Sequence, residues 1–347
     1  MRYRFLPIHF AIYCFVLLSL AVQPVSGKSW ETFSNSKGMF KQGPLPSDTV
    51  QALWTDGTVL WVGTHEGIIK FDGKSWSPAY FGNYWKIKHR QAEGYTGNVE
   101  AIPDNRINSI LGIGDDVWFA TDTGIVIYKT KFGTWEQIKF MHPKWDSGYI
   151  QVLVKGKKHL WIGSWGNGVA YYDLEKKTLH TFGKNDGFIG NHVTGIATLG
   201  DTIWVGTLNN GINKFNLKDR TWTHLHQNNS ILPSNTIKAL AAVGGDKPQI
   251  WISTDSGVLR IFPSEEFIPV FTTKNSGLSA NSVDSLLINN NTTWFATRIG
   301  ICSFHDETWS KMTMPSSLKG LRINQIISYQ DSLWFATLHG GLLRYTP

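Results

Sequence analysis

The sequence predicts an all-β protein, a single seven-bladed β-propeller of four-stranded blades. Three observations predict this fold: a tryptophan motif that recurs seven times, spacings of 40 to 57 residues between its copies, and a half-unit at each end of the chain. Repeats of this length, each with several short strands, are typical of propeller blades. The composition agrees, because 16 Trp and 34 Gly among 347 residues, with 17% charged residues, favour short packed strands joined by tight turns.

The repeated motif is a Trp, an apolar residue, a small residue, and then Thr or Ser. Each Trp is followed by a Gly six or seven positions later. Alternate side chains of a strand share a face, so Trp61 and Gly63 lie on one face. We expect the small residue to admit the adjacent blade while the Trp fills the wedge between the two sheets. The copies begin at Trp61, Trp118, Trp161, Trp204, Trp251, Trp294 and Trp334.

Each repeat is predicted to contain four strands, a to d, with the motif on strand b. An alternating apolar segment before the motif, such as 105–110, predicts strand a. An apolar run after the Gly, such as 68–71, predicts strand c. A further segment, often with a Trp such as Trp76 or Trp135, predicts strand d. Gly, Asn and Asp at the junctions predict tight turns.

The two ends of the mature chain are expected to form one blade together. The seventh repeat reaches Pro347 just after its third strand and lacks a fourth. Residues 29–33 form an orphan segment that matches the strand d type of Ser75-Trp76. The N-terminal strand is therefore predicted to complete the last blade and close the ring, which removes an unpaired sheet edge. An open β-solenoid would leave these matching half-blades unexplained.

Residues 1–27 are predicted to be a secretory signal peptide, and residues 28–347 the propeller. Arg2 and Arg4 precede an apolar stretch that ends near Val22, and small residues near Gly27 offer a cleavage site. A helix that spans a membrane needs about 20 apolar residues, and this stretch is shorter, which disfavours the alternative of a membrane anchor. We expect a periplasmic or extracellular protein without stable membrane insertion after cleavage.

Charge and cysteine content argue against several classes of protein. After cleavage, 31 basic and 26 acidic residues leave a net charge of +5, with one short basic cluster at 86–90, so we expect no nucleic-acid partner. Cys302 is then the single cysteine, and its apolar context predicts a small buried side chain without a disulfide. Catalytic and phosphate-loop motifs are missing from the sequence, and we expect no cofactor and no metal.

The repeats resemble those of bacterial two-component regulator propellers. The resemblance is carried by a leading Asn-x-Val/Ile, as in Asn191 to Val193, by the Trp-x-Gly/Ala-Thr core, and by the Gly with its apolar strand. It extends over nearly all of the mature chain and implies a periplasmic sensor propeller. Many sensors of that family respond to breakdown products of polysaccharides. They often carry two propellers and a kinase, so the single propeller expected here favours a free-standing binding protein.

The face with the b–c turns and the d-to-a connections is the expected ligand face, because loops on a rigid scaffold carry function. Twelve Trp are assigned to strands b and d, and Trp54 to the core. Three others lie in loops over neighbouring blades, where exposed aromatic side chains flanked by charge could stack on a sugar or an aromatic ligand. The alternative is that the long connection between the first two repeats, roughly 78–104, folds on itself with its own small aromatic core. The three are Trp85, Trp145 and Trp165.

Polar residues at the starts of strand a and in the b–c turns are candidates for the mouth of a central channel. A mixed ring of Arg and His could bind an acidic ligand group, such as a uronate or a sulfate, by charge-assisted hydrogen bonds. A solvated turn residue is the alternative reading for each. The candidates are Asp48, His65, Arg106, His192, Arg298, Arg322 and His339.

The leading functional hypothesis is an exported, sensor-type propeller that binds an oligosaccharide or another cell-envelope ligand on this face. The second hypothesis is a scaffold for a periplasmic protein partner. The third is a propeller enzyme such as a lyase, which rests on analogy of fold, and a fold does not determine a function.

Overall fold

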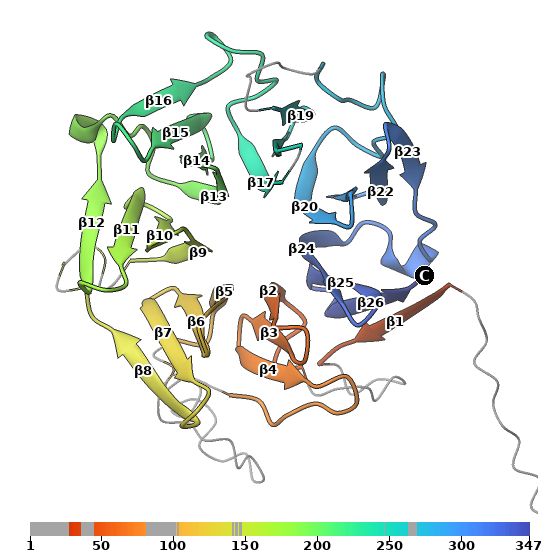
Figure 1. Ribbon diagram of the computed structural model, residues 1–347. Helices are drawn as coiled ribbons and strands as arrows, with labels where there is room; N and C mark the ends of the chain where they lie inside the picture. The colour runs from red at the N-terminus through yellow and green to blue at the C-terminus, as the bar shows by residue number, and fades with distance from the viewer. Residues whose placement is uncertain are drawn as a thin grey trace, which may run out of the picture.

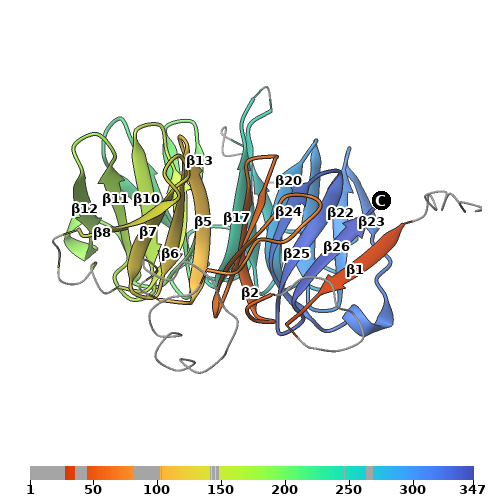
Figure 2. The same cartoon turned by 90° about the horizontal axis from the view of Figure 1, so that it is seen from below.

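The computed structural model describes residues 28–35, 45–80, 102, 104–140, 142, 145, 148–245, 247–262 and 269–347. Over these residues the chain forms seven antiparallel sheets, arranged as blades around one axis (Figure 1). Seen from the side, the blades form a disc, and the innermost strand of each blade runs along the axis (Figure 2). The predicted seven-bladed propeller is confirmed. The predicted signal peptide, residues 1–27, lies outside the described residues.

Within blades 1 to 6 the strands follow the chain outward from the axis. Blade 1 contains β2 (Val50–Thr55), β3 (Leu60–Thr64) and β4 (Gly67–Phe71), and blade 2 contains β5 (Ile107–Ile113), β6 (Asp116–Thr121), β7 (Gly124–Lys129) and β8 (Thr134–Ile138). Blade 3 contains β9 (Ile150–Lys155), β10 (His159–Ser164), β11 (Val169–Asp173) and β12 (Thr178–Phe182), and blade 4 contains β13 (Val193–Leu199), β14 (Thr202–Thr207), β15 (Ile212–Asn216) and β16 (Trp222–Leu225).

The remaining three blades complete the ring. Blade 5 contains β17 (Ile237–Val243), β18 (Gln249–Thr254) and β19 (Val258–Ile261), and blade 6 contains β20 (Val283–Asn289), β21 (Thr292–Thr297), β22 (Gly300–His305) and β23 (Thr308–Lys311). Blade 7 contains β24 (Arg322–Tyr329), β25 (Ser332–Leu338), β26 (Leu342–Thr346) and β1 (Ser29–Phe33). Two short 3-10 helices, η1 (Lys184–Asp186) and η2 (Ser316–Leu318), lie in connections between blades.

The ring closes through the pairing of the N-terminal strand β1 with β26. Ser29 lies opposite Thr346, and Phe33 lies opposite Leu342. The Phe33 ring stacks on Trp334 at a centroid distance of 5.5 Å, so the closing strand also enters the core between blades 7 and 1. The predicted closure is confirmed (Figure 1).

Blades 1 and 5 differ from the predicted pattern in their outermost position. Among the described residues, blade 1 has two isolated bridges there, Phe71 to Trp76 and Ile68 to Tyr80, in place of a fourth strand. Pro78 stands between these bridges and has no amide hydrogen to donate to a ladder. In the described part of blade 5 there is a single such bridge, from Val258 to Phe271.

The small residue of the motif lies against the next blade, as predicted. A Cβ atom added at Gly63 would lie 2.5 Å from Ile107 Cγ2, on the first residue of the next innermost strand. The same close approach occurs at Gly206, 2.6 Å from Ile237 Cγ2. Six of the seven motif Trp side chains are buried, and Trp294 is half-buried. The motif therefore sets the spacing between blades.

The Thr or Ser that ends the motif has a role that the sequence left unassigned. In each blade its hydroxyl donates to the carbonyl oxygen of the Gly beyond the b–c turn, at 2.7 to 3.2 Å. The hydroxyl oxygen also accepts an amide hydrogen from inside the turn, as from Glu66 at 3.0 Å in blade 1. Seven rigid turns result, and several candidate site residues lie at their tips.

Candidate functional site

The b–c turns and the connections between blades lie together on one face of the ring, the connector face. Backbone hydrogen bonds join the b–c turns to the connections before the innermost strands. The His65 amide donates to Thr49 O at 3.1 Å, and the Trp165 amide donates to Tyr149 O at 2.8 Å. The predicted polar candidates all belong to these turns or to the starts of innermost strands, so the structure places them on one face. They do not form one site, however. Three clusters contain Arg106, His192 and the pair Arg298 and Arg322, while His65 and His339 lie beside these clusters and the Asp48 carboxylate accepts the Asn35 amide hydrogen.

A β-bulge near the start of every innermost strand adds a second set of polar residues to this face. In each blade the pairing with strand b shifts by one residue, directly after the first residue of the innermost strand in blades 1 to 6 and after the second, Ile323, in blade 7. Bulges commonly re-aim a side chain. The Asn108 and Asn324 amides each donate to a carbonyl oxygen of the next innermost strand, both at 2.9 Å. The bulged residues are Gln51, Asn108, Gln151, Thr194, Lys238, Asp284 and Asn324.

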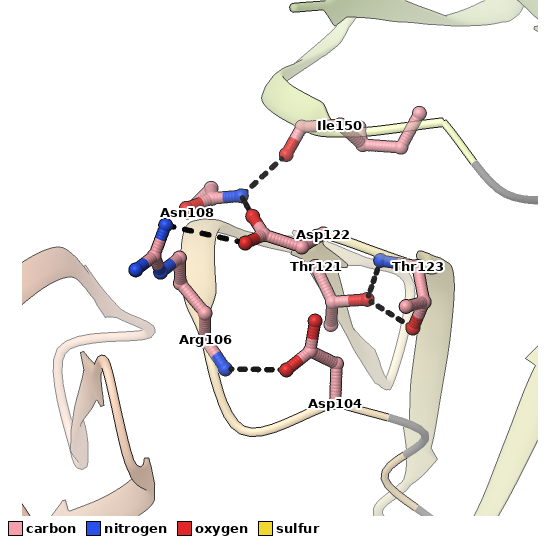
Figure 3. Close-up of polar contacts among 7 residues, drawn as sticks. All are labelled: Asp104, Arg106, Asn108, Thr121, Asp122, Thr123 and Ile150. Atoms are coloured by element: carbon pink, nitrogen blue, oxygen red, sulfur yellow. Dashed lines mark hydrogen bonds and ion pairs between the residues drawn. The ribbon is translucent and has the colours of Figure 1, made fainter.

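The first cluster surrounds Asp122 in blade 2 (Figure 3). Arg106 Nη1 lies 3.3 Å from Asp122 Oδ2, and Asn108 Nδ2 donates to Asp122 Oδ1 at 2.8 Å. Asp104 accepts the Arg106 amide at 3.2 Å, while the neighbouring Thr121 and Thr123 fix the turn. Burial raises the pKa of Asp122, although the Asn108 hydrogen bond and Arg106 oppose this change. Asp122 thus neutralises Arg106, which weakens its predicted role as an anion ligand.

His65 and His339 lie near this cluster. Burial lowers the pKa of His65 to about 4, and the charges of Arg106 and His339 lower it further. His339 Nδ1 and Thr49 Oγ1 share a hydrogen bond of 3.2 Å. At neutral pH His65 is therefore an uncharged imidazole and does not contribute a cation to the predicted ring.

The lowered pKa of His65 predicts an acid-sensitive stability. The unfolded chain takes up this proton near the ordinary pKa of 6.5, and the folded chain takes it up near 4, so stability is lost as the pH falls through that window. The full shift corresponds to about 3.4 kcal/mol, and solvent screening of the partly exposed ring reduces the expected effect to about 1 kcal/mol. His65→Gln should flatten the pH dependence of urea unfolding between 7.5 and 4.5. Equal slopes for the two proteins would contradict the assignment.

The second cluster is an aromatic pair beside a groove between blades 3 and 4. The Trp165 side chain is 43% exposed, and its ring meets that of His192 edge-on, with the centroids 4.7 Å apart. An adjacent cavity of about 770 Å³ is bounded by the turn after Trp165, by η1 and by the b–c turn of blade 4. Its polar side chains are His142, Asn167, Thr181, Lys184, Asp186, Asn191, His192 and Asn210.

The three loop Trp residues therefore do not form the predicted platform together. Trp165 is exposed, as expected. Trp145 is 2% exposed and packs with Trp118, Phe140 and Tyr172 in the core between blades 2 and 3. The prediction that Trp145 is an exposed loop aromatic is wrong, because the connection before blade 3 buries this side chain between two sheets. Trp85 lies outside the described residues.

The third cluster surrounds the buried Asp284 at the start of blade 6. Lys238, Arg298 and Arg322, from three consecutive blades, form ion pairs with its carboxylate. The two Arg residues and His339 line a cavity of about 210 Å³. Sequence reasoning identified the two Arg residues and missed Asp284. The available signal was a carboxylate at the second position of an innermost strand, where the other blades carry neutral residues or Lys.

Several expected properties concern metals, membranes and Cys302. In the part of the chain that the structure describes, no group of three His, Cys, Asp or Glu side chains could hold a metal ion. None of the helices in that part is long and apolar enough to cross a membrane. Cys302 is fully buried, as predicted, and burial raises the pKa of its thiol to about 11.

No family model and no curated protein matches the sequence. Solved structures match with TM-scores that indicate a shared fold. The extracellular domain of one hybrid two-component system from B. thetaiotaomicron superposes with a TM-score of 0.68 at 20% identity, covering 92% of this chain and 39% of its own. A second such domain from that organism gives 0.66 at 18% identity, covering 86% and 40%. This chain thus spans about two-fifths of those domains.

A third solved structure is similar over its whole length. Catalytically inactive virginiamycin B lyase from Staphylococcus aureus, with quinupristin, gives a TM-score of 0.67 at 13% identity, covering 92% of this chain and 100% of the lyase. The chain shares the fold of all three proteins. That likeness agrees with the resemblance noted in the repeats, and at these identities it concerns the fold alone.

Proposed function

We propose that this chain is an exported, sensor-type propeller that binds an oligosaccharide on its connector face. The observation that carries the proposal is the groove between blades 3 and 4, which His192 lines, with the exposed Trp165 ring packed against His192. Sugar rings present C–H faces that pack on aromatic rings, and they carry hydroxyls that both donate and accept hydrogen bonds. An aromatic wall beside amide and charged side chains matches both properties.

The walls of the groove are held in place before any ligand arrives. The amides of Gly166 and Gly168 both donate to Asn191 O, at 2.9 and 3.0 Å. The fully buried Asn213 side chain bonds both the amide and the carbonyl of Ile189, at 3.0 and 2.9 Å. A preformed site loses less conformational entropy on binding, which favours affinity for a polar ligand.

The export and sensor parts of the proposal have separate support. The predicted leader at 1–27 supports export, and two of the structural neighbours are extracellular domains of two-component systems. On this reading the propeller delivers its ligand signal to another protein in the periplasm or at the cell surface.

The mature protein should be tested on an oligosaccharide array that includes acidic sugars, and positive compounds should be titrated calorimetrically. Trp165→Ala should weaken binding at least about 10-fold, equivalent to about 1.4 kcal/mol, because the stacking surface is removed. The melting temperature should change little, since this side chain is exposed.

The matched control is Phe132→Ala. Phe132 is 71% exposed in the turn between β7 and β8, away from the connector face, so its loss should leave ligand affinity unchanged. Unchanged affinity in Trp165→Ala would refute the groove as the site. If no sugar binds and a protein copurifies in stoichiometric amount, the scaffold hypothesis replaces this proposal.

A further inference from the structure

A buried carboxylate without hydrogen bonds marks a different part of the connector face. The Asp284 side chain is 1% exposed at the bulge of β20, and neither of its oxygens accepts a hydrogen bond from the described residues. A buried charge is costly unless it is paired and hydrogen-bonded. The groups around Asp284 must therefore compensate the charge without direct short contacts.

Three cations surround this carboxylate and exceed its charge. Lys238 Nζ lies 3.6 Å from Oδ1, Arg298 Nε lies 3.7 Å from Oδ2, and Arg322 Nε lies 3.9 Å from Oδ1. Direct charge-assisted hydrogen bonds are shorter, about 2.7–2.9 Å. Three positive charges face one negative charge, so the cluster has an excess positive charge that a further anion would balance.

The two Arg side chains are placed to receive such an anion. Both approach Asp284 through Nε, and these ion pairs leave the terminal Nη nitrogens for another acceptor. Their side chains are 62% and 45% exposed, so a ligand can reach them. The planar fork of a guanidinium matches the paired oxygens of a carboxylate or a sulfate.

The cavity between the two Arg residues has the size of a small ligand group. It measures about 210 Å³ and is also lined by Gly320, Leu338 and His339. The Gly320 amide donates to Arg298 O at 3.1 Å, which ties the connection before β24 to the b–c turn of blade 6. The hydrogen bond between His339 and Thr49 fixes the opposite wall. These two hydrogen bonds hold the backbone at Arg298 and the His339 ring beside the cavity.

We propose that this cavity is a binding site for a small oxyanion, either sulfate or the carboxylate of a single sugar acid. Arg298 and Arg322 donate to the anion, and Asp284 is a positioning residue that orients both guanidinium groups. Blades 6 and 7 lie across the ring from the groove of blades 3 and 4 (Figure 1), so the site is separate from the proposed oligosaccharide groove.

The test titrates the mature protein with sodium sulfate, sodium glucuronate and glucose at constant ionic strength, with heat of binding as the readout. Sulfate, glucuronate or both should bind, and glucose should not. Binding of sulfate alone identifies an inorganic anion site, and binding of glucuronate alone identifies a sugar acid site. If neither anion binds more tightly than glucose, the proposal is wrong.

Two sets of variants assign the donors. The double variant Arg298→Gln/Arg322→Gln should weaken anion binding at least 10-fold. The matched control is the double variant Lys157→Gln/Lys218→Gln. These two lysines flank one carboxylate, Asp201, at 2.8 and 3.2 Å on another part of the surface, so the control removes the same charge. An equal loss of binding in both double variants would show unspecific attraction and overturn the site.

A charge-conserving variant covers the case in which the Gln variant fails to fold. Arg298→Lys with Arg322→Lys keeps the counter-charges of Asp284 and removes the planar forks, so binding should weaken at least 3-fold in a folded protein. Full affinity in this variant would refute the guanidinium donors. Trp165→Ala should leave anion binding unchanged, which separates failure of this site from failure of the oligosaccharide groove.

Discussion

Replacing Phe33 by Ala should lower the free energy of unfolding by about 3–5 kcal/mol. Phe33 is 4% exposed on the closing strand β1, and its ring lies 5.4 Å from that of Trp76 and 5.5 Å from that of Trp334. It therefore joins the N-terminal strand to the core shared by blades 7 and 1. Loss of the ring leaves a cavity at the one place where the propeller is closed without chain continuity.

Urea denaturation followed by tryptophan fluorescence measures this effect. Phe132→Ala is the control, because its side chain is exposed and its loss should change stability by less than about 0.5 kcal/mol. A loss of less than about 1 kcal/mol for Phe33→Ala would mean that the closing strand contributes little to the stability of the ring.

The number of blades and the closure could be predicted because both depend on local, repeated signals. Each Trp motif identifies one strand b. The segments at 29–33 and 342–346 each lack a neighbouring strand in their own part of the sequence, so they are predicted to pair with each other. The outermost strand of blade 1 was less predictable. Trp76 has the residue type of strand d, but Pro78 nearby prevents a regular ladder, and two isolated bridges result.

The sequence predicts which face of the ring carries the candidate site residues, but it does not predict which of their side chains contact one another. Turn tips and strand starts are repeated features, so the sequence places Arg106, Arg298 and Arg322 at one end of the ring. Which charges meet depends on three-dimensional packing: Arg106 pairs with Asp122 of its own blade, whereas Arg298 and Arg322, from two neighbouring blades, both pair with Asp284. Trp145 lies in a connection without periodicity, so nothing in the pattern predicted its burial.

Substitution of the motif glycine tests whether the spacing between blades is fixed by that residue. Gly206→Val should destabilise the protein by about 3 kcal/mol through overpacking. An added Cβ would lie 2.6 Å from Ile237 Cγ2 and 3.2 Å from Leu240 Cδ1, both in the next innermost strand. Gly206 does not have a positive φ, so the expected cost is steric and independent of backbone strain.

The matched control is Gly244→Val, at a position with open space around an added Cβ and no positive φ. It should leave the unfolding transition within about 0.5 kcal/mol of the parent protein. The decisive comparison adds Ile237→Ala to each variant. If Gly206 fixes the approach of blade 5, the smaller side chain should restore part of the loss in Gly206→Val and only destabilise Gly244→Val. Additive effects in both pairs would show that the two blades do not meet through these residues.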